Sequence, residues 1–157
     1  MDTATAWVIT VSDRCSAGEA EDRSGPAVAD LLRGAGFEVI GRVMVPDDTE
    51  QIRQVLRDAE ANLVVTTGGT GLSPRDVTPQ ATRLELDYEI PGLSEHMRQA
   101  GLASTPMSML SRSLAGVMRG KLVLNLPGSE RGATESLAAV LPALGHAVDL
   151  LGGRDGH

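Results

Sequence analysis

The stretch Thr66–Pro79 concentrates the residue types in this chain that are best suited to chemistry. Its glycines allow positive φ and close approach of the backbone to a ligand, and consecutive N–H groups beside hydroxyls can bind an anion. It is neither a P-loop nor a dinucleotide fingerprint, and on glycine content alone a plain strand-to-helix turn is equally possible. The residues that would form the site are Thr67, Gly68, Gly69, Thr70, Gly71, Arg75 and Asp76.

Other polar turns follow expected strands. Ser12 and Asp13 come after an apolar run, Asp47 follows a second run, and Pro127-Gly128-Ser129 follows a third and precedes a helix. Ligands of open α/β sheets bind outside the carboxyl ends of strands, so we expect these turns to share one edge. Asp48 or Thr49 would cap the next helix, which leaves Asp47 to meet Asp76; the alternative is that both acids only serve turns and caps.

Arg112, flanked by Ser111 and Ser113, has the pattern of an anion-binding residue, since arginine suits bidentate recognition of phosphate or carboxylate. A surface arginine is an equally good interpretation. His96 as a general base is less expected than a solvated helix histidine. No second histidine stands at metal-ligand spacing and Cys15 is the single cysteine, which argues against a zinc site.

Alternating apolar runs and amphipathic stretches predict a three-layer α/β/α sandwich around a mostly parallel sheet. We expect residues 1–157 to form one domain, with 152–157 as a frayed tail. Ser24 and Pro26 suggest a hydroxyl-capped helix start, Gly120 a tight turn, and Pro142 a kink or early helix end. The expected strands are 6–11, 37–45, 62–67 and 121–126, and the expected helices begin near 24, 50, 78, 91 and 130, the last ending at Leu144.

Composition limits the classes of function. The net charge is −7 and aromatic residues make up 2% of the chain, which argues against nucleic-acid and anionic-membrane partners. No apolar run approaches a membrane span, and no basic segment followed by an apolar one opens the chain. With one cysteine and no internal disulfide, we expect a cytoplasmic protein.

Together these motifs resemble the Mog/MoaB family of molybdenum-cofactor biosynthesis proteins, which includes the G domain of gephyrin-like proteins. The resemblance covers nearly the whole chain in family order. The segments that carry it are Val11–Arg14, Val45–Asp48, Thr67–Gly71, Pro74–Pro79, Ile90–Gly92, Glu95–Arg98, Leu110–Arg112 and Asn125–Ser129.

The resemblance implies a molybdopterin adenylyltransferase that uses Mg²⁺ to transfer AMP from ATP to the phosphate of molybdopterin and releases pyrophosphate. Asp47 and Asp76 match the family's two functional acids, and would hold the Mg²⁺ or orient the attacking phosphate. Arg75 and Ser129 are further candidates for phosphate or pterin contacts. Family assembly implies a homotrimer, with a hexamer as the other possibility, and handover of the product to a molybdate-insertion enzyme.

Three other functions compete with this one. The same domain occurs inside the much longer molybdate-inserting enzyme, although a chain of 157 residues fits the transferase better. A pyrophosphatase-like use of the fold is a second enzymatic possibility. The third is a non-catalytic molybdopterin-binding or scaffold protein of the MoaB branch.

Overall fold

One mixed sheet organises the protein, whose computed structural model describes residues 2–154. The strand order is β2-β1-β3-β6-β5-β4; neighbours from β2 to β6 are parallel, and β5 and β4 are antiparallel additions. This arrangement confirms the expected fold class. The strands are β1 (Thr5–Val11), β2 (Glu38–Val45), β3 (Leu63–Thr67), β4 (Tyr88–Glu89), β5 (Ala115–Met118) and β6 (Lys121–Leu126).

The parallel strands end almost level with one another. Val11 pairs with Val45, Thr10 with Thr67, and Thr67 with Leu126. The chain passes from β1 to β2 on one side and then returns to β3 on the other side of β1, so the direction of strand addition reverses at β1. In open α/β sheets such a reversal leaves a crevice outside the strand ends, where ligands bind.

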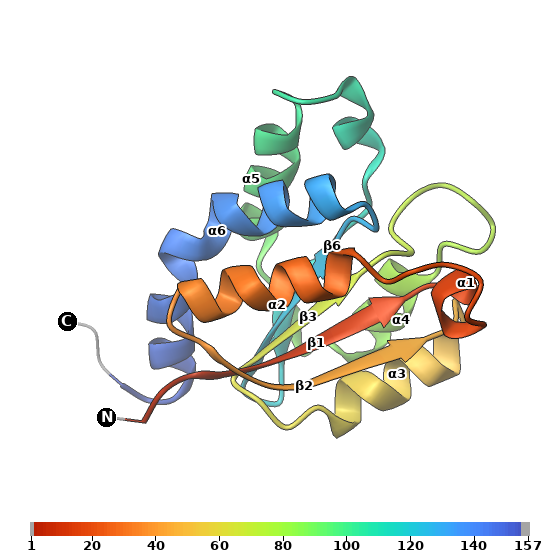
Figure 1. Cartoon of the computed structure of the whole chain (residues 1–157). Coiled ribbons are helices and arrows are strands. Elements are labelled where there is room, and N and C mark those ends of the chain that lie inside the picture. The colour runs from red at the N-terminus through yellow and green to blue at the C-terminus, as the bar shows by residue number, and fades with distance from the viewer. Residues whose placement is uncertain (1, 155–157) are drawn as a thin grey trace.

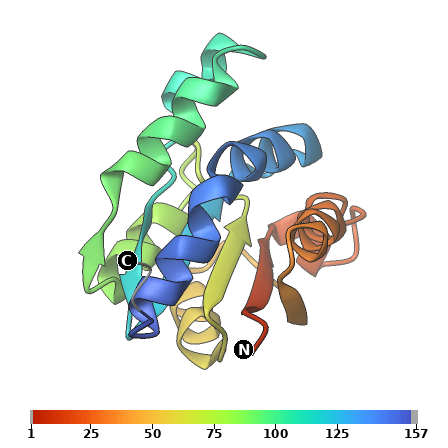
Figure 2. The same ribbon diagram turned by 90° about the vertical axis from the view of Figure 1, so that its left-hand side faces the viewer.

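Helices cover both faces of the sheet (Figures 1 and 2). One layer contains α2, α5 and α6, over a core that includes Leu32, Leu122 and Leu137; the other contains α3 and α4, over a core that includes Ile52 and Val64. The helices are α1 (Asp13–Ser16), α2 (Ser24–Gly34), α3 (Thr49–Asp58), α4 (Thr78–Glu85), α5 (Pro91–Gly101), the 3₁₀ helix η1 (Pro106–Leu110) and α6 (Glu130–Leu151).

Two local expectations about helices were wrong. Ser24 does not cap α2: its hydroxyl donates to Thr67 Oγ1, and Asp22 Oδ1 accepts the N–H of Gly25 instead. The last helix does not end at Leu144: it continues through Pro142 to Leu151, and Figure 2 shows that it is bent along its length. Interior proline costs about 3 kcal/mol. Buried Leu144 and Val148, beyond Pro142, contribute about 1.5–3 kcal/mol each, which explains the continuation.

Three further expectations concern the turn at Gly120, the C-terminal tail and membrane spans. Gly120 forms the tight turn of the β5–β6 hairpin, with positive φ at both Arg119 and Gly120. The backbone N–H groups of 152–154 bond to the last turn of α6; residues 155–157 of the expected tail lie outside the described residues. Within residues 2–154, no helix has the length and apolar character needed to cross a membrane.

Glu85 at the end of α4 joins the two helices of the α3–α4 layer. Its carboxylate, 6% exposed, accepts hydrogen bonds from Arg53 and Arg57 at 2.8 Å. The hydrogen bonds from Arg57 and Arg53 lower the pKa of Glu85, against the opposing effect of burial. This clamp fixes the helix that begins at the carboxyl edge of the sheet.

We expect Glu85→Gln to lower the free energy of unfolding by about 2 kcal/mol at pH 7, because both arginines lose a charged acceptor. Since the folded-state pKa of Glu85 is depressed below 4.5, the stabilisation is present above pH 4.5 and is lost as pH falls through the folded-state pKa. In urea unfolding experiments between pH 7 and pH 3, the free energy of unfolding should therefore fall less steeply with pH in the variant than in the wild type. If the free energy of unfolding depended on pH equally in variant and wild type, this account would be contradicted.

Candidate functional site

A polar cavity of about 550 Å³ opens at the strand ends where the direction of strand addition reverses. It lies between the ends of β1 and β3, the start of α2, and the turn before α6. Both expected acids line it. Its walls are formed by Thr10, Val11, Ser12, Cys15, Glu21, Asp22, Arg23, Ser24, Asp47, Thr67, Gly68, Gly69, Asp76, Gly128, Ser129 and Glu130.

Two aspartates from adjacent strand ends hold each other in place. The N–H of Asp13 donates to Asp47 Oδ2 at 3.0 Å, and the N–H of Asp47 donates to Asp13 Oδ1 at 2.9 Å. Arg75 reaches across from the glycine-rich stretch and donates to both oxygens of Asp13, at 2.9 and 3.0 Å. Asp13 and Arg75 thus form a bidentate ion pair beside the cavity, and Asp47 is oriented by Asp13.

The two linked carboxyls differ in their electrostatics. Hydrogen bonding from Arg75 lowers the pKa of Asp13. Burial raises the pKa of Asp47; the hydrogen bond from Asp13 offsets part of this, and the negative charges of Asp13 and Asp76 raise it further. A cation placed between Asp47 and Asp76 would relieve this repulsion.

Asp76 and Asp47 each have one carboxylate oxygen that is available to bind a ligand. Asp76 Oδ2 accepts the N–H of Ser73 at 3.0 Å, and within residues 2–154 neither Asp76 Oδ1 nor Asp47 Oδ1 has a hydrogen-bond partner. No group of three or more metal-binding side chains exists in the same part of the chain. Mg²⁺ is commonly bound by one or two carboxylates together with substrate phosphates. The two acids therefore fit a Mg²⁺ that arrives with a phosphate-bearing ligand.

The glycine loop, Gly68–Gly71, needs its glycines for physical reasons. Gly68 and Gly69 have φ of 95° and 70°, and a Cβ on Gly68 would collide with the carbonyl oxygen of Val11. The N–H of Gly68, expected to face a ligand, instead donates to Leu126 O at 3.0 Å. Within the described residues, the N–H groups of Gly69, Thr70 and Gly71 have no acceptor. Three such N–H groups in sequence have the arrangement that can bind an anion.

Arg112 supports the loop from behind. Its guanidinium donates to the carbonyl oxygens of Gly71 at 2.9 Å and Asp76 at 2.7 Å and to Gln80 Oε1 at 3.1 Å, and its N–H donates to Thr70 O at 2.9 Å. The anion expected at Arg112 is replaced by acceptors inside the protein. Arg112 therefore positions the loop on which Asp76 stands.

We expect Arg112→Ala to lower the free energy of unfolding by about 2–3 kcal/mol, because loop carbonyls lose a charged donor. Limited proteolysis should cut the variant faster near residues 71–76. Arg42→Ala is the matched control, since the exposed side chain of Arg42 on β2 makes no hydrogen bond or ion pair with any described residue. Unfolding in urea measures both variants, and equal stability of the two would contradict the supporting role.

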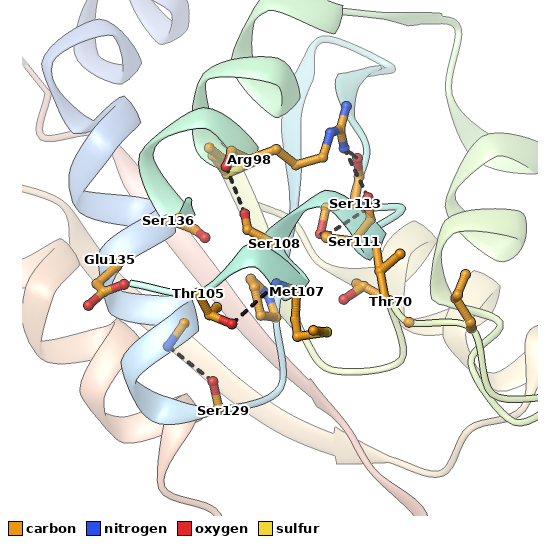
Figure 3. A pocket seen from close by; sticks show the side chains of 17 residues that line it. Thr70, Arg98, Thr105, Met107, Ser108, Ser111, Ser113, Ser129, Glu135 and Ser136 are labelled. Carbon is orange, nitrogen blue, oxygen red and sulfur yellow. Dashed lines mark hydrogen bonds between the residues drawn. The ribbon is translucent and has the colours of Figure 1, made fainter. Parts of the chain in front are cut away.

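A second, mainly apolar cavity of about 380 Å³ lies on the other side of the glycine loop (Figure 3). Met97 and Met107 supply apolar surface, and the hydroxyl-bearing residues Thr70, Ser111 and Ser129 also line it. Exposed Leu72, Met107 and Leu110 line its mouth. The remaining wall residues are Gly71, Arg98, Gly101, Thr105, Ser108, Ser113, Pro127, Gly132, Glu135 and Ser136.

The structure brings most of the expected site residues together. The polar cavity is lined by Ser12, Asp47, Thr67, Gly68, Gly69, Asp76, Gly128 and Ser129. The apolar cavity is lined by Thr70, Gly71, Ser111, Pro127 and Ser129. Asp13, Arg75 and Arg112 line neither cavity and are held by protein groups. His96 is exposed and lies outside both.

Sequence reasoning missed a buried amide that fixes the strand ends. Asn125 Nδ2 donates to Thr66 Oγ1 and Thr82 Oγ1, each at 3.0 Å, and Asn125 Oδ1 accepts the N–H of Leu114 at 3.2 Å. An asparagine within an otherwise apolar strand is the signal that could have identified it, because a buried amide needs partners. It ties β3 and β6 to α4 directly behind the loop.

Cavity walls from the segment 21–24 and from α5 and η1 were also missed. These residues stand far in sequence from the strand ends, and no local pattern shows that they fold back beside them. The polar residues Asp22 and Arg23 just before α2 are the one visible signal.

The chain matches the family model described as a probable molybdopterin binding domain over residues 7–146. It is 41% identical to the molybdenum cofactor synthesis protein cinnamon of Drosophila melanogaster, over 97% of this chain but only 26% of that protein. It is 39% identical to the molybdopterin adenylyltransferase of Escherichia coli K12, covering 94% of this chain and 79% of that enzyme. Several relatives are therefore much longer than this chain, while others are close to it in length.

Solved structures agree with the fold. The molybdopterin biosynthesis enzyme MoaB from Thermus thermophilus superposes with a TM-score of 0.90 at 51% identity, covering 96% of this chain and 97% of that one.

Proposed function

Since the chain belongs to the Mog/MoaB family of molybdenum-cofactor biosynthesis proteins, we propose that it is a molybdopterin adenylyltransferase. It would transfer AMP from ATP to the phosphate of molybdopterin and release pyrophosphate. The observation that carries the proposal is the pair Asp47 and Asp76, each with one unpaired carboxylate oxygen, in a cavity beside the glycine loop. The relatives that bear this activity as their name support it.

The reaction needs little covalent help from the protein. An oxygen of the molybdopterin phosphate forms a bond to the α-phosphorus of ATP, and the bond to the pyrophosphate oxygen breaks with its electrons passing to pyrophosphate. Positioning and charge stabilisation dominate such transfers. The free N–H groups of Gly69, Thr70 and Gly71 would bind phosphate oxygens, and Mg²⁺ held by Asp47 and Asp76 would neutralise their charge.

The two cavities suit two substrates whose phosphates must meet. The polar cavity, which contains both acids, fits the Mg²⁺-bound phosphate chain of ATP. The apolar cavity, with its methionines and ring of hydroxyls, fits a flat heterocycle such as the pterin. Ser129 lines both, and the glycine loop separates them, so the reacting phosphates would meet at the loop.

The test incubates the protein with ATP, Mg²⁺ and molybdopterin and follows labelled AMP into adenylylated molybdopterin, with and without EDTA. We expect transfer with release of one pyrophosphate per product and its loss on chelation. Molybdopterin binding without transfer would favour the non-catalytic binding protein. Phosphate release from pyrophosphate alone would favour the pyrophosphatase-like function.

Assembly, partner and compartment are part of the same proposal. A homotrimer, or a hexamer, is expected from the family and is checked by light scattering. The product would pass to a molybdate-insertion enzyme, and the expected compartment is the cytoplasm. Neither a nucleic acid nor a membrane has a role in this function.

A further inference from the structure

The polar cavity has an excess of negative charge that a nucleotide must overcome. Within the described chain, Arg23 is the single cationic side chain in its wall. The carboxylates of the wall are those of Glu21, Asp22, Asp47, Asp76 and Glu130. Asp22 is engaged by Thr10 Oγ1 at 2.8 Å and by the N–H of Gly25 at 3.0 Å. One Mg²⁺ would balance only Asp47 and Asp76, so a triphosphate still needs a positive partner from the protein.

Two other arginines near the cavity are already committed. Arg75 is bound at two points to Asp13, and Arg112 is bound to loop carbonyls; neither lines the cavity. Arg23 is different: its side chain is 72% exposed, and its Nε lies 3.5 Å from Glu21 Oε2, a longer contact than the 2.8 Å pairs of Arg57. Its guanidinium makes no hydrogen bond and no other ion pair with any described residue. Arg23 is therefore free to turn toward a ligand.

Arg23 stands at the start of α2 without contributing a cap to that helix. It is the N-cap of the eleven-residue helix α2 and makes no capping hydrogen bond there. Serine, threonine, aspartate and asparagine are favoured at N-caps, and a cation at the positive end of a helix is unfavourable. The N–H of Gly25 is capped by Asp22 Oδ1 instead, so Arg23 has no capping role and its side chain is available for another one.

We propose that Arg23 is a substrate-binding residue that binds the phosphate chain of the nucleotide in the polar cavity. Its planar guanidinium can donate two parallel hydrogen bonds to phosphate oxygens. The positive end of α2 adds to the same field, and Glu21 holds the side chain only loosely in the absence of ligand. This inference rests on the proposed function and adds a residue to its nucleotide site.

Arg23→Ser is the decisive variant, because Asp22 still caps α2 and a cation is removed from the positive end of the helix, so the melting temperature should be unchanged or raised. We expect the KM for ATP, and the Kd for a non-hydrolysable ATP analogue with Mg²⁺, to rise roughly ten- to a hundredfold. The KM for molybdopterin should stay within about twofold, and Arg23→Lys should recover part of the affinity for ATP while lacking bidentate geometry. Glu21→Gln should tighten ATP binding, since the competing carboxylate is gone.

Arg33→Gln is the matched control, because Arg33 lies on the same helix, is exposed, and pairs with Asp30 alone among the described residues. Its Kd and KM values should equal those of the wild type. If Arg23→Ser binds the analogue as tightly as wild type, the inference is overturned, whether or not the protein transfers AMP. If the wild type binds the analogue but transfers no AMP, the proposed function fails and the binding measurements still decide the role of Arg23. A wild type that does not bind the analogue overturns both.

Discussion

Asp76→Asn should keep the fold and lower kcat for AMP transfer about 10²–10³-fold, the usual cost of removing one group that stabilises transition-state charge. The amide oxygen of asparagine can still accept the N–H of Ser73, now 3.0 Å from Asp76 Oδ2, so the turn keeps its geometry. What is lost is the negative charge that faces Asp47 across the cavity. Steady-state kinetics at saturating ATP and molybdopterin measure the loss, and circular dichroism with urea unfolding verifies the fold.

A matched control exists at the opposite end of β6. Asp87 Oδ2 likewise accepts a backbone N–H, from Arg119 at 2.8 Å, but it stands beside the β5–β6 hairpin and lines neither cavity. Asp87→Asn should therefore leave kcat unchanged. Wild-type turnover by Asp76→Asn would remove Asp76 from the site. Equal losses in both variants would show that the effect is structural.

Gly68→Ala should be the most destabilising substitution in the loop. Its φ of 95° is unfavourable for any L side chain, and the added Cβ would collide with the carbonyl oxygen of Val11. Backbone strain of about 1–3 kcal/mol and overpacking of about 1–3 kcal/mol together predict a loss of roughly 2–6 kcal/mol in the free energy of unfolding. Because the N–H of Gly68 bonds to Leu126 O, the loop would separate from β6 and transfer activity would be lost with it.

Gly145→Ala provides the comparison for Gly68→Ala. Gly145 lies inside α6, has no positive φ, and an added Cβ would meet no atom within 4 Å. Alanine there should stabilise the protein by about 0.5–1 kcal/mol. Urea unfolding of both variants gives the difference directly. A Gly68→Ala protein as stable as the Gly145→Ala protein would show that the loop tolerates a side chain.

Much of the fold is encoded in short-range sequence patterns, and these could be predicted from the sequence. The continuous apolar run of β3 and the polar turns after β1 and β2 predicted a parallel sheet with a polar edge, and the registers of Val11, Thr10 and Thr67 place that edge where it was expected. Strand ends are predictable because parallel pairing brings them together whatever the connecting helices do. The roles expected for the site residues remain predictions until the variants are measured.

Contacts between side chains that are distant in the sequence could not be predicted in the same way. The sequence does not distinguish the three arginines near the site. In the structure Arg112 is bound to carbonyl oxygens of the loop, Arg75 pairs with Asp13, and Arg23 has only a weak contact with Glu21. Which partner an arginine takes depends on side chains that are distant in the sequence, and no periodicity reports that. The length of α6 was misjudged for a related reason: burial beyond Pro142 outweighed a local helix breaker.

The close packing of two turns has a consequence for how new specificities could arise on this scaffold. A Cβ at Gly128 would lie 3.3 Å from Gly68 Cα, and a Cβ at Gly68 would collide with Val11 O, so the two turns together leave little room for a side chain on either glycine. The outer wall of the apolar cavity is built differently, from exposed Met107 and Leu110 on a short 3₁₀ helix. Laboratory evolution toward other heterocycles should therefore accumulate changes in that wall, while Gly68 and Gly128 stay fixed, because the atoms that a side chain on either would meet belong to the backbone and no second substitution can make them smaller.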